Sequence, residues 1–187
     1  IFQMTILKSL HRTAYQVLPH SIVENYKGEE KYQIFHFFND TEVFFEFFKV
    51  VVESDSTVLD CGLNFGMHTD MVLELGAKNV FAFEASREVL AKVRSKYESN
   101  PAVTVVEKAL SNKGGKVTFY ECNASGASSL RSTRDIRKHG GYEYKVEAIR
   151  LDDVPALREI DNISCMKVDL EGADILALSG GLNLLKK

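Results

Sequence analysis

Polar residues follow two successive apolar runs at a spacing that suits the binding of a nucleoside. Asp60 ends the first run, and a loop containing Gly62, Asn64 and Gly66 follows it. Glu84 ends the second run, 18 positions after Gly66. Glycines allow a sharp turn and the close approach of a ligand. An acid about 20 positions beyond such a loop commonly accepts hydrogen bonds from ribose hydroxyl groups. The spacing therefore predicts a nucleoside site.

The elements that must position these residues are a strand, a loop, a helix and a second strand. Val58-Leu59 and residues 79–83 read as strands, and apolar residues at helical spacing lie between them: Met67, Met71, Val72 and Leu75. Gly76 is typical of a helix end. Together they form one βαβ unit of a doubly wound fold. The structural alternative is a glycine-rich turn whose acids only stabilise the fold.

The loop favours S-adenosylmethionine over a dinucleotide. It reads Gly-x-Asn-x-Gly and lacks the third glycine of the dinucleotide fingerprint. Asp60 would repel a pyrophosphate, whereas S-adenosylmethionine carries no phosphate and has an ammonium and a sulfonium that an acid attracts. Two other functions remain open: a nicotinamide-dependent oxidoreductase, and a non-catalytic module that binds a partner protein through its aromatic N-terminal part.

The rest of the chain predicts an α/β fold, a Rossmann-like doubly wound and mainly parallel sheet. Apolar strands near residues 58, 80, 104 and 164 alternate with helices. We expect residues 56–187 to form a cofactor-binding domain that lacks the distal strands of a complete sheet of this type. Residues 1–55 would be a helical, aromatic extension packed on it. The phenylalanine-rich helix predicted over 42–52 is typical of core, with a lid over an apolar substrate as the alternative.

Six blocks of the chain resemble FkbM-type methyltransferases in sequence and in order. They cover residues 58–66 (VLDCGLNFG), 81–85 (FAFEA), 108–112 (KALSN), 126–130 (GASSL), 151–153 (LDD) and 167–173 (KVDLEGA). The similarity extends over about residues 56–185. It implies the class I methyltransferase fold, S-adenosylmethionine as the cofactor, and O-methylation of a hydroxyl on a small molecule or sugar.

The resemblance also implies roles for individual residues. Asp60, Gly62 and Asn64 would hold the methionine part of the cofactor, and Gly66 would close the loop. Glu84 would bind the ribose. The turn around Lys108 and Ala109 would lie beside the adenine. Asp169 would lie near the methyl group or the acceptor. Cys61, Leu63 and Ala85 depart from the usual valine, alanine and proline, but none of these changes removes a polar ligand.

Three residues are candidates for a general base. Methyl transfer is an in-line displacement in which alignment of the reactants supplies most of the rate, and a hydroxyl acceptor gains further from a base. Asp169 comes first because it follows a strand at the ligand-binding edge of the sheet, although it could equally be a cofactor ligand or a helix cap. Glu171 is second. His68 titrates near neutral pH, but a histidine in a first helical turn can also be a cap or face solvent.

Composition limits the partners. The net charge of −3 disfavours general nucleic-acid binding. The absence of a long apolar run and of a signal peptide predicts a cytoplasmic protein without a membrane span. The basic run that includes Arg131, Arg134 and Lys138 would suit an anionic acceptor, or is simply a solvated surface. The oligomeric state is not indicated.

No metal site is predicted. Cys61, Cys122 and Cys165 lack metal-type spacing, and we expect them to be reduced thiols, inert where they are buried. Asp152-Asp153 is an acidic pair, but neighbours on a helix do not face one ligand together. Asp152 is predicted to cap the short helix that begins near Val154.

Overall fold

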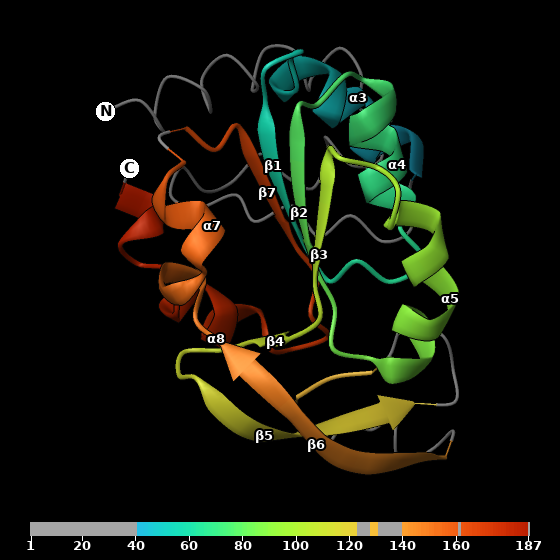
Figure 1. Ribbon diagram of the computed structural model, residues 1–187, viewed down its shortest axis with the longest axis vertical. Coiled ribbons are helices and arrows are strands. Elements are labelled where there is room, and N and C mark those ends of the chain that lie inside the picture. Colours follow the sequence, from blue (N-terminus) through green and yellow to red (C-terminus); the bar gives the residue numbers. More distant parts are fainter. Residues whose placement is uncertain (1–40, 123–127, 131–139, 161, 187) are drawn as a thin grey trace, which may run out of the picture. The chain divides into compact units, whose positions relative to one another are not determined.

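The computed structural model describes residues 41–122, 128–130, 140–160 and 162–186 (Figure 1). The chain divides into two compact units, residues 1–50 and 51–187, which are considered separately below. Residues 1–40, most of the helical, aromatic extension expected over residues 1–55, lie outside the described residues.

The helix predicted over 42–52 is present as α3 (Thr41–Val51). The ring of Phe48 lies 6.2 Å from that of Phe44 and 5.9 Å from that of Phe47, measured between centroids. Phe44 and Phe48 are four positions apart, so they lie on the same side of the helix. The aromatic side chains therefore pack on one another along α3.

A four-stranded parallel sheet forms the centre of the second unit. Its strands are β1 (Thr57–Cys61), β2 (Asn79–Phe83), β3 (Val103–Val106) and β7 (Cys165–Val168), in the order β3-β2-β1-β7. Every residue of β1 is buried, which explains why its sequence shows no polar alternation. The mainly parallel sheet predicted from the sequence is confirmed.

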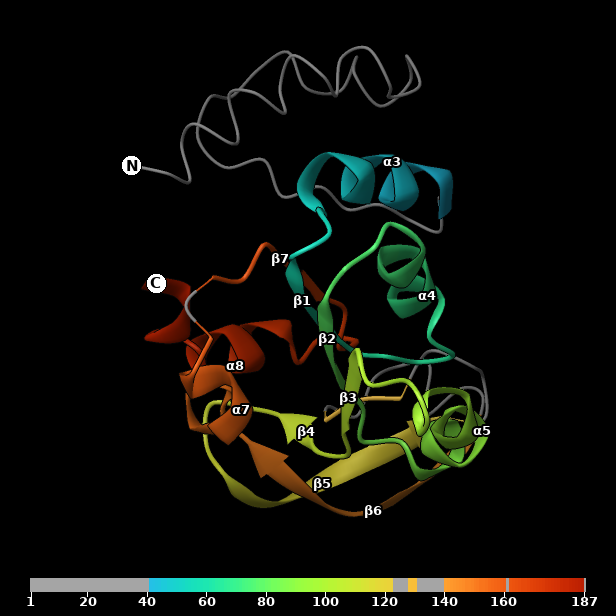
Figure 2. The same cartoon turned by 45° about the horizontal axis from the view of Figure 1, so that its top comes forward.

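Helices cover both faces of this sheet (Figures 1 and 2). On one face lie α4 (Met67–Glu74) and α5 (Arg87–Tyr97), and on the other α7 (Pro155–Arg158) and α8 (Asp174–Ser179). The side chains of β2 alternate between the two faces of the sheet. Phe81 and Phe83 pack on the side of α7 and α8, and Ala82 packs on the side of α5. Ser86 caps α5 by accepting a hydrogen bond from the Val89 N–H at 3.1 Å. The doubly wound α/β fold is confirmed.

A smaller sheet lies at the carboxyl ends of the parallel strands (Figure 2). It consists of β4 (Ala109–Leu110), β6 (Gly141–Ile149) and β5 (Gly115–Cys122) in that order, with β5 and β6 antiparallel. The turn predicted around Ala109 is instead the short buried strand β4, because it pairs with β6.

The predicted role of Asp152 is wrong. Asp152 lies in the 3-10 turn η2 (Leu151–Asp153), and Val154 occupies the N-cap position of α7. The Asp152 carboxylate accepts hydrogen bonds from the N–H groups of Asn183 at 3.1 Å and Leu184 at 3.0 Å. It therefore stabilises the start of η3 (Leu184–Lys186), and it lies two positions before the N-cap residue of α7.

Candidate functional site

The carboxyl ends of three strands bring the predicted site residues to one edge of the sheet. Cys61, the last residue of β1, is aligned with Phe83 of β2 and Val168 of β7. The Gly62 N–H donates to the Phe83 carbonyl at 3.1 Å, and the Asp169 N–H donates to the Cys61 carbonyl at 2.9 Å. The strand order reverses at β1, and open α/β sheets bind ligands at such a point.

Both loop glycines are required by close contacts within the protein. Gly62 and Gly66 have φ angles of 97° and 83°, which side chains rarely adopt. A Cβ on Gly62 would lie 2.1 Å from the Asp169 carbonyl oxygen, and one on Gly66 would lie 2.0 Å from Tyr97 Oη. The sharp turn expected from the sequence is present, and the groups that approach these two glycines are protein atoms.

Glu84 holds the glycine loop through backbone hydrogen bonds. Its Oε2 accepts from the Asn64 N–H at 2.9 Å, and its Oε1 accepts from the N–H groups of Ala85 and Ser86 at 2.8 Å each. Burial raises the pKa of Glu84, and these three hydrogen bonds act in the opposite direction. Oε2 receives one hydrogen bond from the described residues, so it retains a lone pair for a further donor.

Asn64 carries an unsatisfied buried acceptor. Its φ angle is 48°, a left-handed conformation that asparagine tolerates better than most residues. Its side-chain Oδ1 is buried and has no hydrogen-bond partner among the described residues. Such an atom is costly unless something donates to it. A ligand with a hydroxyl or ammonium donor would satisfy this atom.

Asp60 is buried in a charged cluster rather than open to solvent. Its exposed fraction is 1%, and its Oδ2 accepts from Thr69 Oγ1 at 2.8 Å. Its Oδ1 lies 3.3 Å from Nζ of Lys167. Nζ also donates to the Gly62 carbonyl at 2.6 Å and lies 3.8 Å from Asp169 Oδ2. The sequence analysis missed Lys167, although a lysine inside an otherwise apolar strand predicted for the central sheet is unusual enough to have indicated it.

The two carboxylate candidates differ in their surroundings. The side chain of Asp169 is 61% exposed at the end of β7. It does not cap α8, because Ala173 is the N-cap residue and the Asp174 carboxylate accepts the nearby backbone N–H groups. Glu171 is exposed with a φ of 50°, and its carbonyl accepts from Ser129 Oγ at 2.8 Å.

His68 lies in the first turn of α4 and is partly buried. Burial lowers its pKa, the charge of Lys167 lowers it further, and Asp60 and Asp169 oppose both effects. Gly66 is the N-cap residue of α4, so His68 does not have that role. The imidazole is consequently neutral at pH 7, the form that can accept a proton.

The second sheet borders the Glu84 end of the site. Ala109 packs in a buried cluster with Ala85, Phe119 and Ala148. Its side chain is therefore covered by the protein, and only its backbone remains to face a ligand.

A buried glutamate that the sequence analysis missed joins the second sheet to the start of α5 near this end. Glu121, 2% exposed, accepts hydrogen bonds from Ser86 Oγ at 2.8 Å, Ser128 Oγ at 2.7 Å and Tyr144 Oη at 2.5 Å. In the sequence it stands in an alternating strand, where nothing distinguishes it from a solvent-facing residue. Its contacts fix the residue that caps α5, two positions after Glu84.

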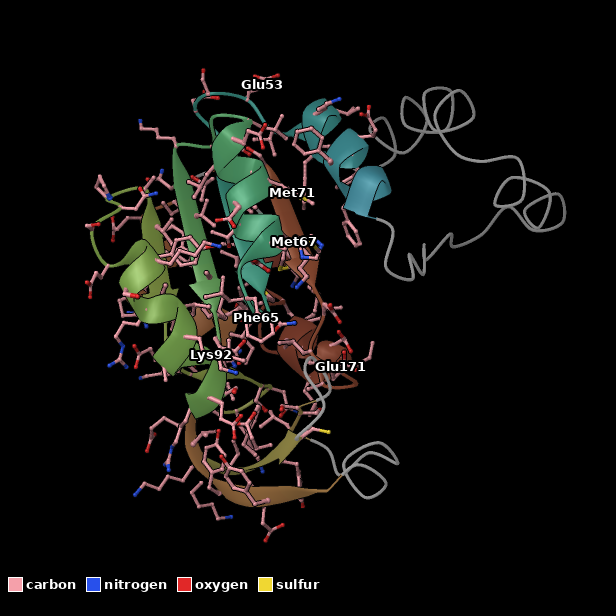
Figure 3. The ribbon with its side chains drawn as sticks, turned by 90° about the vertical axis from the view of Figure 1, so that its right-hand side faces the viewer. Glu53, Phe65, Met67, Met71, Lys92 and Glu171 are labelled. Atoms are coloured by element: carbon pink, nitrogen blue, oxygen red, sulfur yellow. The ribbon has the colours of Figure 1, made fainter. Side chains whose placement is uncertain are left out.

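Two apolar side chains of the glycine-loop region are exposed. Phe65 is 44% exposed and Met67 is 46% exposed, so Met67, although at helical spacing with Met71 and Val72, does not share their burial. Figure 3 shows both residues on the same side of the molecule as Glu171. Nζ of Lys92 lies 5.4 Å from the centre of the Phe65 ring.

Several other expectations concern the wider chain. The basic residues Arg131, Arg134 and Lys138 lie outside the described residues.

Cys61, Cys122 and Cys165 are free thiols, and burial raises the pKa of Cys165 to about 12. Within the described part of the chain, no helix is long and apolar enough to cross a membrane, and no three His, Cys, Asp or Glu side chains are grouped to bind a metal ion.

Comparison with solved structures finds limited similarity. An rRNA methylase from Streptococcus thermophilus is 21% identical, with a TM-score of 0.32 over 35% of this chain and 40% of that chain. An S-adenosylmethionine dependent methyltransferase from Mesorhizobium loti is 20% identical, with a TM-score of 0.29 over 36% of this chain and 31% of that chain.

Comparison of sequences is more informative. The 2-O-methyltransferase NoeI of Sinorhizobium fredii (strain NBRC 101917 / NGR234) is 27% identical over 146 residues, which cover 71% of this chain and 60% of NoeI. The chain thus spans about three fifths of the length of that relative. The profile of the Methyltransferase FkbM domain matches residues 60–187, from Asp60 in β1 through the end of the chain. The resemblance stated from the six blocks is therefore confirmed, and the chain belongs to the FkbM methyltransferase family, which uses S-adenosylmethionine as its methyl donor.

Proposed function

We propose that this protein transfers the methyl group of S-adenosylmethionine to a hydroxyl group of a small molecule or sugar. The observation that carries the proposal is the unsatisfied Oδ1 of Asn64, a residue whose backbone N–H donates to the Glu84 carboxylate, at the strand edge where a doubly wound sheet binds its ligand. The name of NoeI, a 2-O-methyltransferase, supports oxygen as the methylated atom. The net charge of −3 favours a small acceptor over a nucleic acid.

The residues at the strand ends fit the donor in two places. Glu84 Oε2 would accept a hydrogen bond from a ribose hydroxyl while its other contacts keep the loop in position. Asn64 Oδ1, together with the loop of Gly62 and Gly66, would receive the amino-acid part. Asp60 would act through Lys167 and Thr69, because its own carboxylate is buried.

The chemistry requires little of the protein beyond alignment. When bound, S-adenosylmethionine supplies a methyl group that is already activated for displacement. The chain contributes binding, orientation and a base for the acceptor hydroxyl. Asp169 is the first candidate because its carboxylate is largely exposed at the end of β7. Glu171 and the neutral imidazole of His68 are the other candidates.

Calorimetry with S-adenosylhomocysteine and with NADH tests donor binding. We expect the wild-type protein to bind S-adenosylhomocysteine and not NADH. Glu84→Ala should weaken that binding by about tenfold to a hundredfold, the effect of losing a charge-assisted hydrogen bond of ~1.5–3 kcal/mol. Glu84→Gln keeps most of the shape of the side chain and serves as a milder variant. Glu147→Ala, at an exposed position of β6, is the matched control.

The same experiment separates the proposal from its alternatives. Binding of NADH alone would favour an oxidoreductase. A folded protein that binds neither compound would favour a non-catalytic module. Where the donor binds, transfer of a labelled methyl group to sugars and to their deoxy analogues tests O-methylation, since loss of transfer on removal of one hydroxyl identifies the acceptor oxygen.

A further inference from the structure

We infer that Lys167 is a positioning residue for the amino-acid end of the donor. This role rests on the proposed function and extends it to a residue that the sequence did not single out. Lys167 lies in β7, and its side chain is only 6% exposed. Burying an ammonium group is costly unless it is paired and hydrogen-bonded. Its partners therefore indicate what the charge does at this place in the fold.

The hydrogen bond of Lys167 connects the ends of two strands. Nζ donates to the Gly62 carbonyl at 2.6 Å, and the two residues are 105 positions apart in the chain. Gly62 begins the loop that carries Asn64, and it also touches the carbonyl of Asp169 so closely that a Cβ would overlap it. Lys167 therefore holds the glycine loop against the residues that follow β7.

The charges around Lys167 are complementary to an amino acid. Nζ lies 3.3 Å from Asp60 Oδ1 and 3.8 Å from Asp169 Oδ2. Without the lysine, two neighbouring acids would repel the carboxylate of a ligand while attracting its ammonium. With the lysine, both charges of a zwitterion find an opposite charge. The cluster as a whole carries one negative charge, which matches the single positive charge of S-adenosylmethionine.

This arrangement makes a prediction that depends on the ligand. S-adenosylhomocysteine carries the amino-acid tail, and 5′-methylthioadenosine has the same nucleoside without it. If Lys167 positions the tail, its loss weakens binding of the first compound and spares the second. If Lys167 only stabilises the fold, its loss weakens the binding of both compounds alike.

The experiment is calorimetry of both compounds with the wild-type protein, Lys167→Met, Lys167→Gln and Lys167→Arg. Wild type should prefer S-adenosylhomocysteine, and Lys167→Met should weaken its binding by at least about tenfold while changing that of 5′-methylthioadenosine by less than about twofold. Lys167→Arg keeps the charge and should recover part of the loss. Lys167→Gln keeps a donor for the Gly62 carbonyl and serves if the methionine variant does not fold. Lys116→Met, at an exposed position of β5, is the control.

Each other outcome has a definite meaning. A wild-type protein that binds the two compounds equally well overturns the inference without any variant. Equal weakening of both compounds by Lys167→Met or Lys167→Gln also overturns it, while the proposed function stands. If wild type binds neither compound, the proposed function fails and this inference fails with it.

Discussion

Removal of the buried Glu121 carboxylate should destabilise the second unit and disturb the Glu84 end of the site. Glu121 accepts from three hydroxyl groups, those of Ser86, Ser128 and Tyr144. In Glu121→Ala each of these hydroxyl groups loses the acceptor of its own hydrogen. Each still accepts a hydrogen bond from a backbone N–H: Ser86 from Val89, Ser128 from Cys122 and Tyr144 from Arg87. Removal of the buried charge offsets part of the ~1.5–3 kcal/mol that each hydrogen bond to a carboxylate contributes, so a net loss of about 1 kcal/mol for each bond should lower the free energy of unfolding by ~3 kcal/mol.

Glu121→Gln should cost less. Its amide oxygen can still accept from the two serines, whereas its NH₂ group faces the Tyr144 hydroxyl, which then loses its acceptor. We expect a loss of ~1 kcal/mol, similar to the effect of Tyr144→Phe. The free energy of unfolding should therefore be lowest for Glu121→Ala, higher for Glu121→Gln and highest for wild type.

Urea denaturation followed by circular dichroism measures these differences, with Glu143→Ala on the exposed side of β6 as the control. Binding of S-adenosylhomocysteine should weaken in the same order, because Ser86 also donates its N–H to Glu84. The reasoning is refuted if Glu121→Ala unfolds within about 0.5 kcal/mol of wild type, the range of ordinary surface substitutions.

Three further predictions follow from the site. Gly62→Ala should abolish tight binding of S-adenosylhomocysteine and lower the melting temperature, because its Cβ would lie 2.1 Å from the Asp169 carbonyl at a φ of 97°; wild-type affinity would contradict this. Burial and the charge of Lys167 lower the pKa of His68, so the folded protein takes up this proton less readily than the unfolded chain. The contribution of His68 to the free energy of unfolding is therefore complete above pH ~6.5 and is lost as the pH falls through the lowered pKa of the folded state. An NMR titration checks this, and Lys167→Met should move the pKa upward. Burial raises the pKa of Cys61, so iodoacetamide should label it only after unfolding by urea, as mass spectrometry would show.

The sequence alone determined the framework of the protein. Alternating apolar runs, the glycine loop and the acids at positions 60 and 84 predicted the parallel sheet and the edge at which the candidate site lies. These features are local, since a strand, its following loop and the next helix are encoded by neighbouring residues. The same is true of Ser86, whose capping role depends on a residue three positions away.

The tertiary structure decided which charges meet. From the sequence, Asp60 was an acid that attracts a cationic ligand, whereas in the fold its charge is balanced by a lysine from a strand more than 100 positions further on. Glu121 and Asp152 likewise bond to groups 35 and 32 positions away, and neither partner was predictable. Side-chain periodicity shows which face of an element is buried, but the pairing of polar groups depends on how distant elements pack.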